Sequence, residues 1–260
     1  MHDVIAKQAV AKSFSDAAKD YDTFARFQHQ LAKRLLAMCP QTNKQSILDL
    51  GCGTGYCLPL LNQHYDNATL TGADIAPGML DVAKQAYPKF HFCVADAENL
   101  PFENEQFDLI FSNLAVQWCD DFSQVLKQAY ACLKPGGHLV LSTLADGTLD
   151  ELKQAWSTVD QHQHVNQFDD EHDLKFMIES SGFTIQQCDI ATLYDFHSDV
   201  RGLTDSLKRI GAHNITDGRA KGLTSPQKVK QFMQAMESFR QDAGLPASYR
   251  VLSCCLVKPN

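Results

Sequence analysis

The sequence predicts an α/β protein built on a doubly wound, mostly parallel sheet of seven strands. Short apolar runs, which read as buried strands, alternate with amphipathic helical segments along most of the chain. The first run leads directly into a glycine-rich turn. With 260 residues, 44% of them hydrophobic, the chain is long enough for one large domain. Because parallel strands need crossover connections, this alternation favours helices on both faces of the sheet and a ligand at the carboxyl ends of the strands.

The elements follow one another in a regular order. The strands are expected at 46–50, 69–75, 90–94, 107–112, 138–144, 183–196 and 249–257. The helices among them are expected at 56–65, 77–87, 122–133 and 170–181. Pro77 suits the first turn of the second helix, and the segment from Lys134 to Gly137 ends the third.

Two segments lie outside this alternation. Residues 4–38 read as helical and precede the first strand, so they can fold over the ligand site. About fifty residues with two helical patterns separate the last two strands and read as an inserted cap. We therefore expect one domain, 1–260, divided into a helical N-terminal arm at 1–40, a core at 45–196 and 248–260, and a helical cap at 197–247.

Composition restricts the partners of the chain. A formal charge of −8 argues against broad nucleic-acid binding, which depends on a basic surface. The N-terminus has no apolar stretch of signal-peptide length, and no window approaches the roughly 20 apolar residues of a membrane span. The nine cysteines are scattered without CxxC spacing and read as reduced thiols. We expect a cytoplasmic protein with no nucleic-acid or membrane partner.

One segment departs from the acidic average. Residues 201–230 hold seven basic and two acidic side chains, a local net of +5, so the remainder carries −13. Such a run is often only a solvated surface, but it can also attract an acidic partner. The histidines and aspartates at 162–172 show no zinc-type spacing, and no metal is expected.

The glycine-rich turn carries the most specific pattern. Asp49-Leu50-Gly51-Cys52-Gly53-Thr54-Gly55 has the form D-x-G-x-G-x-G, whereas a nicotinamide dehydrogenase needs GxGxxG to bind a pyrophosphate at a helix start. Asp74 lies 19 residues after Gly55, where a carboxylate can bind the two hydroxyls of a ribose. Asp96-Ala97 follows the third strand, where a carboxylate and an amide can bind an adenine.

This ordered series resembles the class I S-adenosylmethionine-dependent methyltransferases, which have a Rossmann-like core, from residue 46 to about 144. The resemblance implies S-adenosylmethionine as cofactor and S-adenosylhomocysteine as product. It assigns the methionine pocket to the glycine turn, the ribose to Asp74 and the adenine to Asp96 with Ala97. Ile75, Met79 and Leu114 are equally consistent with core packing. The implied cofactor-binding residues are Asp49, Gly51, Cys52, Gly53, Gly55, Asp74, Ile75, Met79, Asp96, Ala97, Asn113, Leu114, Tyr21 and Gln28.

Longer motifs point to one group within these enzymes. They are Ser112-Asn113-Leu114-Ala115-Val116-Gln117-Trp118-Cys119, the run from Ala145 to Trp156, Ser206 to Asn214 with Gly218-Arg219, and Phe14 to Tyr21 with Gln28. Over nearly the whole chain they resemble the malonyl acyl-carrier protein methyltransferases of biotin synthesis. One departure is Arg209, where that family often has a small residue.

The resemblance implies methyl transfer to the free carboxylate of malonyl acyl-carrier protein, giving the methyl ester that primes synthesis of the pimeloyl precursor of biotin. The attacking oxygen is already an anion at pH 7, so no catalytic base is expected. Arg219, and after it Lys208, is the choice to bind the malonyl carboxylate. The implied substrate-binding residues are Gln117, Trp118, Lys208, Arg219 and Tyr21, although Tyr21, Gln28 and Trp118 are as consistent with packing. The basic segment 201–230 is expected to attract the acidic carrier protein.

Three other functions are compatible with parts of the sequence. A methyltransferase acting on a small carboxylic acid or a quinone precursor would share the cofactor motifs. A non-catalytic methyltransferase-like subunit would have a decayed pocket, whereas Asp49, Asp74 and Asp96 are all present. A nicotinamide oxidoreductase is opposed by the glycine spacing.

Overall fold

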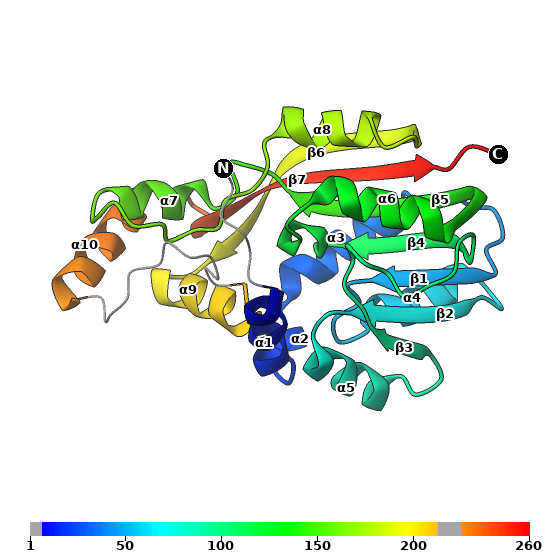
Figure 1. Cartoon of the computed structure of the whole chain (residues 1–260). Helices are drawn as coiled ribbons and strands as arrows, with labels where there is room; N and C mark the ends of the chain where they lie inside the picture. The colour runs from blue at the N-terminus through cyan, green and yellow to red at the C-terminus, as the bar shows by residue number, and fades with distance from the viewer. Residues whose placement is uncertain (1–6, 213–224) are drawn as a thin grey trace.

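The computed structural model of the chain describes residues 7–212 and 225–260. Its strands are β1 (Ser46–Leu50), β2 (Thr69–Asp74), β3 (His91–Val94), β4 (Phe107–Asn113), β5 (Leu133–Leu144), β6 (Thr184–His197) and β7 (Leu245–Val257). They form one sheet in the order β3-β2-β1-β4-β5-β7-β6 (Figure 1). Strands β1 to β5 run parallel, and β7 is antiparallel to β5 and β6. The prediction of a doubly wound, mostly parallel sheet of seven strands is confirmed.

Local sequence signals explain where several helices begin. Side chains of Asp121, Asp170, Asp199 and Ser225 accept a hydrogen bond from the first turn of the helix that each precedes, and Pro77 begins another helix. The helices are α1 (Lys7–Ala17), α2 (Tyr21–Phe24), α3 (Arg26–Leu36), α4 (Cys57–His64), α5 (Pro77–Ala86), α6 (Phe122–Cys132), α7 (Asp150–Ser157), α8 (Glu171–Glu179), α9 (Val200–Arg209), α10 (Pro226–Glu237) and the short 3-10 helix η1 (Val116–Trp118).

Both faces of the sheet are covered because its strands alternate their apolar side chains. On β1, Ile47 packs with α3 and α4, whereas Leu48 belongs to the cluster that includes α6 and α8. On β4, Leu109 and Phe111 face the first pair of helices and Ile110 faces the second. The carboxyl ends of the parallel strands therefore lie together at one edge of the sheet. At this edge, β1 lies between β2 on one side and β4 on the other.

Strand β5 begins five residues earlier than the predicted 138, because helix α6 ends at Cys132 and Leu133 already pairs with Phe107. The pairing then shifts, so that His138 lies opposite Leu109. Between these points, the amide of Gly136 donates to the carbonyl of Lys258 at 2.9 Å. The Lys134–Gly137 segment is therefore a bulge within the strand.

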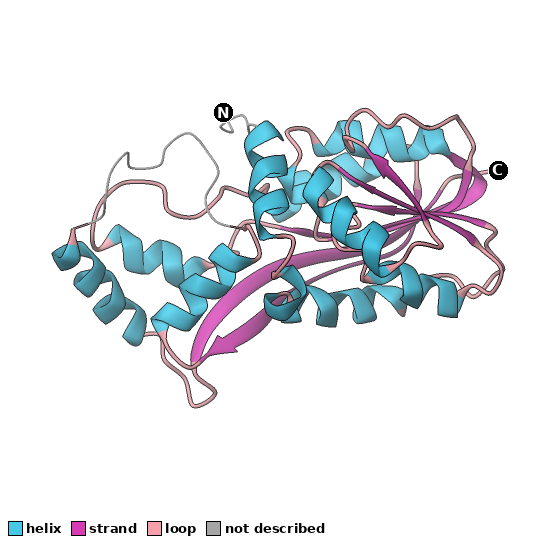
Figure 2. Cartoon of the chain, turned by 90° about the horizontal axis from the view of Figure 1, so that it is seen from below, coloured by secondary structure: helices cyan, strands magenta, loops and turns pink. Residues whose placement is uncertain are grey.

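The last two strands are long and extend past the other strands of the sheet toward the cap helices (Figures 1 and 2). One apolar cluster joins α9 and α10 to α7 and β7 through Leu203, Phe232, Met236, Leu152 and Tyr249. Helix α7 lies within residues 45–196, which were expected to form the core, but it packs with the cap helices. The division at 40, 197 and 247 stays a prediction. Within 7–212 and 225–260, no helix is long and apolar enough to cross a membrane.

Candidate ligand-binding site

The glycine turn after β1 is packed closely on its inner side and open on its outer side. The amides of Gly51 and Cys52 donate to the carbonyl of Ala73 at 2.7 and 3.0 Å. Gly51 has φ +73°, and a Cβ at this position would lie 2.1 Å from the Cβ of Ala115. A Cβ at Gly53 would meet nothing within 4 Å. A ligand can therefore approach the backbone at Gly53.

Asp74 stabilises this turn from the end of β2. One carboxylate oxygen accepts from the amide of Gly53 at 2.8 Å, and the other accepts from the amide of Ala76 at 2.8 Å. Burial raises the pKa of Asp74, and the backbone hydrogen bonds partly oppose that rise. The carboxylate also lines the cavity beside the turn, where its remaining lone pairs can accept hydrogen bonds from a ligand.

Asp49 is the least satisfied polar group of the site. Its side chain is 1% exposed, and one carboxylate oxygen has no hydrogen-bond partner among the described residues. Burial raises the pKa of Asp49 to about 8, and the negative charge of Asp74 adds to the shift. An unpartnered buried carboxylate is unfavourable unless a donor arrives from a ligand.

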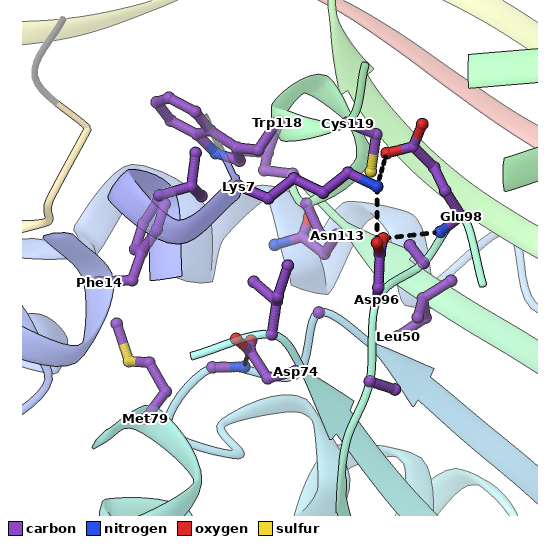
Figure 3. A pocket seen from close by; sticks show the side chains of 18 of the residues that line it. Lys7, Phe14, Leu50, Asp74, Met79, Asp96, Glu98, Asn113, Trp118 and Cys119 are labelled. Carbon is purple, nitrogen blue, oxygen red and sulfur yellow. Dashed lines mark hydrogen bonds and ion pairs between the residues drawn. The ribbon is translucent and has the colours of Figure 1, made fainter. Parts of the chain in front are cut away.

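The first cavity lies over the turn (Figure 3). Its described lining consists of Lys7, Val10, Phe14, Tyr21, Leu50, Gly51, Gly53, Asp74, Ile75, Met79, Ala95, Asp96, Ala97, Glu98, Asn113, Leu114, Ala115, Trp118 and Cys119. Four expected cofactor-binding residues are absent from this lining, namely Asp49, Cys52, Gly55 and Gln28. Cys52 is 8% exposed, and Gly55 packs against Tyr87, so the structure places them in the support of the turn.

Lys7 connects the N-terminal arm to the far end of this cavity. Its ammonium lies 2.6 Å from a carboxylate oxygen of Asp96 and 2.7 Å from one of Glu98 (Figure 3). Burial alone would lower the pKa of Lys7, but the hydrogen bonds and charges of the two carboxylates raise it. Asp96 also accepts from the amide of Glu98 at 3.0 Å. Helix α1 is thus bound to the loop after β3.

Asn113 and Leu114 form the floor between β4 and the arm. The amide nitrogen of Asn113 donates to the carbonyl of Gln28 at 3.1 Å, and its amide oxygen accepts from Ser142 at 3.1 Å. Leu114 has φ +51°, a left-handed conformation that a residue with a side chain rarely adopts. Its amide donates to the carbonyl and the hydroxyl of Ser142, both at 3.1 Å. These bonds hold the floor in a strained conformation.

A second cavity, of about 370 Å³, lies beneath the cap. It shares Phe14, Tyr21, Leu114 and Trp118 with the first cavity. The rest of its described lining is Gln28, Gln117, Leu144, Thr148, Leu149, Leu152, Trp156, Gln163, His164, Val165, Asn166, Phe168, Thr204, Leu207, Lys208, Ile210, Ala212 and Tyr249. Lys208 is the sole lysine or arginine among these residues, and none of them carries a carboxylate.

Four of the five expected substrate-binding residues meet at the second cavity. Tyr21 and Trp118 line both cavities, whereas Gln117 and Lys208 line the second. Gln117 donates to the carbonyl of Leu114 at 2.7 Å, and its buried oxygen has no partner in the described part of the chain. Gln28, expected at the cofactor, also lines the second cavity. Arg219 lies outside the described residues.

Several lining residues were absent from the predicted site. Lys7 and Glu98 line the first cavity, and Trp156, His164 and Tyr249 line the second. Lys7 is 89 positions from Asp96 in the chain, and nothing in its local sequence indicates that partner. The run from Ala145 to Trp156 is a motif of the sequence. Its position in a cavity wall depends on how α7 packs against α10, which the motif does not indicate.

Comparisons with known proteins agree with this architecture. Residues 48–141 match a family model described as a methyltransferase domain. The chain is 37% identical to the malonyl-[acyl-carrier protein] O-methyltransferase of Hahella chejuensis, over 96% of this chain and 90% of that protein. It is 41% identical to the biotin biosynthesis bifunctional protein BioHC of Cellvibrio japonicus over 98% of this chain, but spans 51% of that longer protein. An S-adenosylmethionine-dependent methyltransferase from Mesorhizobium loti shares the fold, with a TM-score of 0.53 and 18% identity over 86% of this chain and 96% of that one.

Proposed function

We propose, since the chain belongs to the family of malonyl-[acyl-carrier protein] O-methyltransferases, that it transfers a methyl group from S-adenosylmethionine to the free carboxylate of malonyl acyl-carrier protein. The product is the malonyl methyl ester that primes synthesis of the biotin precursor. The observation that carries this proposal is the pair of joined cavities, one beside the glycine turn and one without any acidic side chain in its described lining.

The residues of the first cavity fit the cofactor. Asp49 is outside the described lining of the first cavity, but its unpartnered oxygen requires a donor, and the ammonium of the methionine end can supply one. The open side of Gly53 accommodates close approach, and Asp74 faces the ribose hydroxyls. When bound, S-adenosylmethionine supplies a methyl group activated by a positively charged sulfur. The apolar side chains of Ile75 and Met79 suit the adenosine.

The second cavity fits an anionic acceptor. In a chain of net charge −8, its lack of described carboxylates removes repulsion, and Lys208 offers a cation. The two cavities meet at Tyr21, Leu114 and Trp118, so these side chains border the place where acceptor and methyl group come together. A malonyl carboxylate is ionised at pH 7, and the protein has no proton to remove. Its residues align the two groups and exclude water.

We place the carrier protein on the basic cap segment 201–230. Arg201, Lys208, Arg209 and Lys230 are exposed there, and Arg209 pairs with Asp20 of the arm at 3.1 Å. Acyl-carrier proteins are typically acidic, so a basic cap accelerates their encounter with the enzyme. All nine cysteines are free, which is consistent with the reducing cytoplasm as the site of the reaction.

The decisive experiment measures transfer of a labelled methyl group to purified malonyl acyl-carrier protein, with malonyl coenzyme A and free malonate in parallel. Mass spectrometry must locate the methyl group on the malonyl carboxylate. Transfer to a small carboxylic acid, with none to any malonyl thioester, would instead support the small-molecule alternative.

A matched pair of variants tests the acceptor site. We expect Lys208→Met to raise the KM for the malonyl substrate about tenfold, the effect of losing one charged hydrogen bond. Lys230→Met removes the same charge from an exposed residue of the cap outside the cavity, and it should leave the KM for malonyl coenzyme A unchanged. Equal effects of both variants would remove Lys208 from the acceptor site.

A further inference from the structure

The second cavity has a wall that the methyl-transfer reaction does not explain. This wall, which we name the Trp156–His164 wall, consists of Trp156, Gln163, His164, Val165, Asn166 and Phe168. The same six residues also line a groove that contains Asp146, Lys153 and His162. The wall therefore borders both the cavity beneath the cap and a second hollow, and a long ligand in the cavity would pass along it.

His164 is held rigidly within this wall. Its imidazole stacks on the indole of Trp156 with centroids 3.8 Å apart and planes 8° apart, and Trp156 stacks in turn on Phe232. The Nε2 atom of His164 lies 2.8 Å from a carboxylate oxygen of Asp160. The other oxygen of Asp160 accepts from the ammonium of Lys228 at 2.8 Å. These contacts leave the ring few alternative orientations.

The contact with Asp160 determines which ring nitrogen is offered to a ligand. A carboxylate can only accept, so Nε2 carries the hydrogen and Nδ1 of the neutral ring is an acceptor. Within the described part of the chain, no hydrogen bond reaches Nδ1 of His164. The side chain is 17% exposed, and the cavity and the groove are the hollows that it lines. The wall thus presents a fixed acceptor beside the flat face of an indole.

We propose that His164 binds the flexible arm that joins the malonyl thioester to its carrier, by accepting a hydrogen bond from an amide N–H of that arm at Nδ1, with Asp160 as the positioning residue. This inference rests on the proposed function. The arm, phosphopantetheine, alternates methylene groups with secondary amides. The cavity wall likewise combines apolar side chains, Val165 and Phe168, with amide side chains, Gln163 and Asn166.

Three acceptors with different arms test the assignment. Malonyl acyl-carrier protein and malonyl coenzyme A carry both amides of the arm, whereas the S-ethyl thioester of malonate carries none. For His164→Ala, we expect the KM of the two arm-bearing substrates to rise about tenfold, the effect of one lost hydrogen bond, with kcat nearly unchanged. The kcat/KM of the S-ethyl thioester should stay at the wild-type value.

Two further variants separate binding from folding. His164→Asn retains a polar group near Nδ1 and should recover part of the affinity. His162→Ala is the matched control, because His162 lines the groove but not the cavity, and it should behave as wild type. Asp160→Asn should shift the KM of arm-bearing substrates in the same direction as His164→Ala. Thermal unfolding and S-adenosylmethionine affinity confirm that each variant is folded.

The outcomes distinguish this inference from the proposed function. If wild type methylates the thioesters and His164→Ala slows all three equally, or none, the assignment of His164 is overturned and the proposed function stands. If wild type methylates no malonyl thioester, both fail. Calorimetric titration of holo acyl-carrier protein, which has the arm without malonate, gives a readout independent of turnover. Equal binding by wild type and His164→Ala would also overturn the assignment.

Discussion

The buried carboxylate of Asp49 makes cofactor binding depend on pH. In the free protein its pKa is raised to about 8 by burial and by Asp74, so most molecules hold Asp49 uncharged at pH 7. We expect the ammonium of the cofactor to bind the ionised form. The ionised fraction is roughly one in a hundred at pH 6 and about one in four at pH 7.5, so the affinity should rise about 20-fold between them.

Calorimetry measures this effect directly. The dissociation constant of S-adenosylmethionine is determined at several pH values from 6 to 7.5. A second series at pH 7, in buffers of different ionisation enthalpy, counts the protons released, and about 0.9 proton should be released per molecule bound. Asp49→Asn should bind the cofactor more weakly at pH 7.5, without the pH dependence and without proton release. Asp66→Asn, at an exposed position, is the control. A flat profile for wild type, or the same slope in Asp49→Asn, would refute the reasoning.

The same group should lower the stability of the cofactor-free protein. The pKa of an aspartate in an unfolded chain is near 3.8, so the unfolded chain loses the Asp49 proton there, whereas the folded chain keeps it until about pH 8. The folded state therefore binds more protons between these values, and its stability falls as the pH rises through that window. Asp49→Asn removes the effect and should raise the free energy of unfolding at pH 7 by up to about 4 kcal/mol. Urea unfolding should show no such gain at pH 4.

Three further changes have defined outcomes. Lys7→Gln breaks the ion pairs with Asp96 and Glu98, where we expect the adenine to bind, and should weaken cofactor binding about fivefold by calorimetry, whereas Lys12→Gln, which breaks an exposed pair, should not. Gly51→Ala places a Cβ 2.1 Å from Ala115 at φ +73° and should lower the midpoint of thermal unfolding by several degrees and abolish cofactor binding. Arg219→Ala should raise the KM for malonyl acyl-carrier protein at unchanged cofactor affinity; an unchanged KM would exclude Arg219 from the acceptor site.

Much of the fold and of the lining of the first cavity was predictable because their signals are local. A short apolar run indicates a buried parallel strand, and closely spaced glycines after it indicate a turn. Neighbouring residues were therefore enough to predict β1 and the positions of Gly51 and Gly53. Asp74 was predictable because the length of a crossover unit sets its distance from the turn. The beginning of β5 was missed, since the bulge depends on pairing with β4 and with the end of the chain.

The sequence by itself determined that the chain forms a doubly wound sheet with a glycine turn and an acidic residue after each of two strands, because these patterns lie within a few neighbouring residues. Only the tertiary structure decided that Lys7 pairs with Asp96 and that Trp156 and His164 form a wall of the second cavity. Such contacts join residues from different helices and loops. Their distances are set by how the arm and cap pack on the sheet, and no local pattern along the chain encodes that packing.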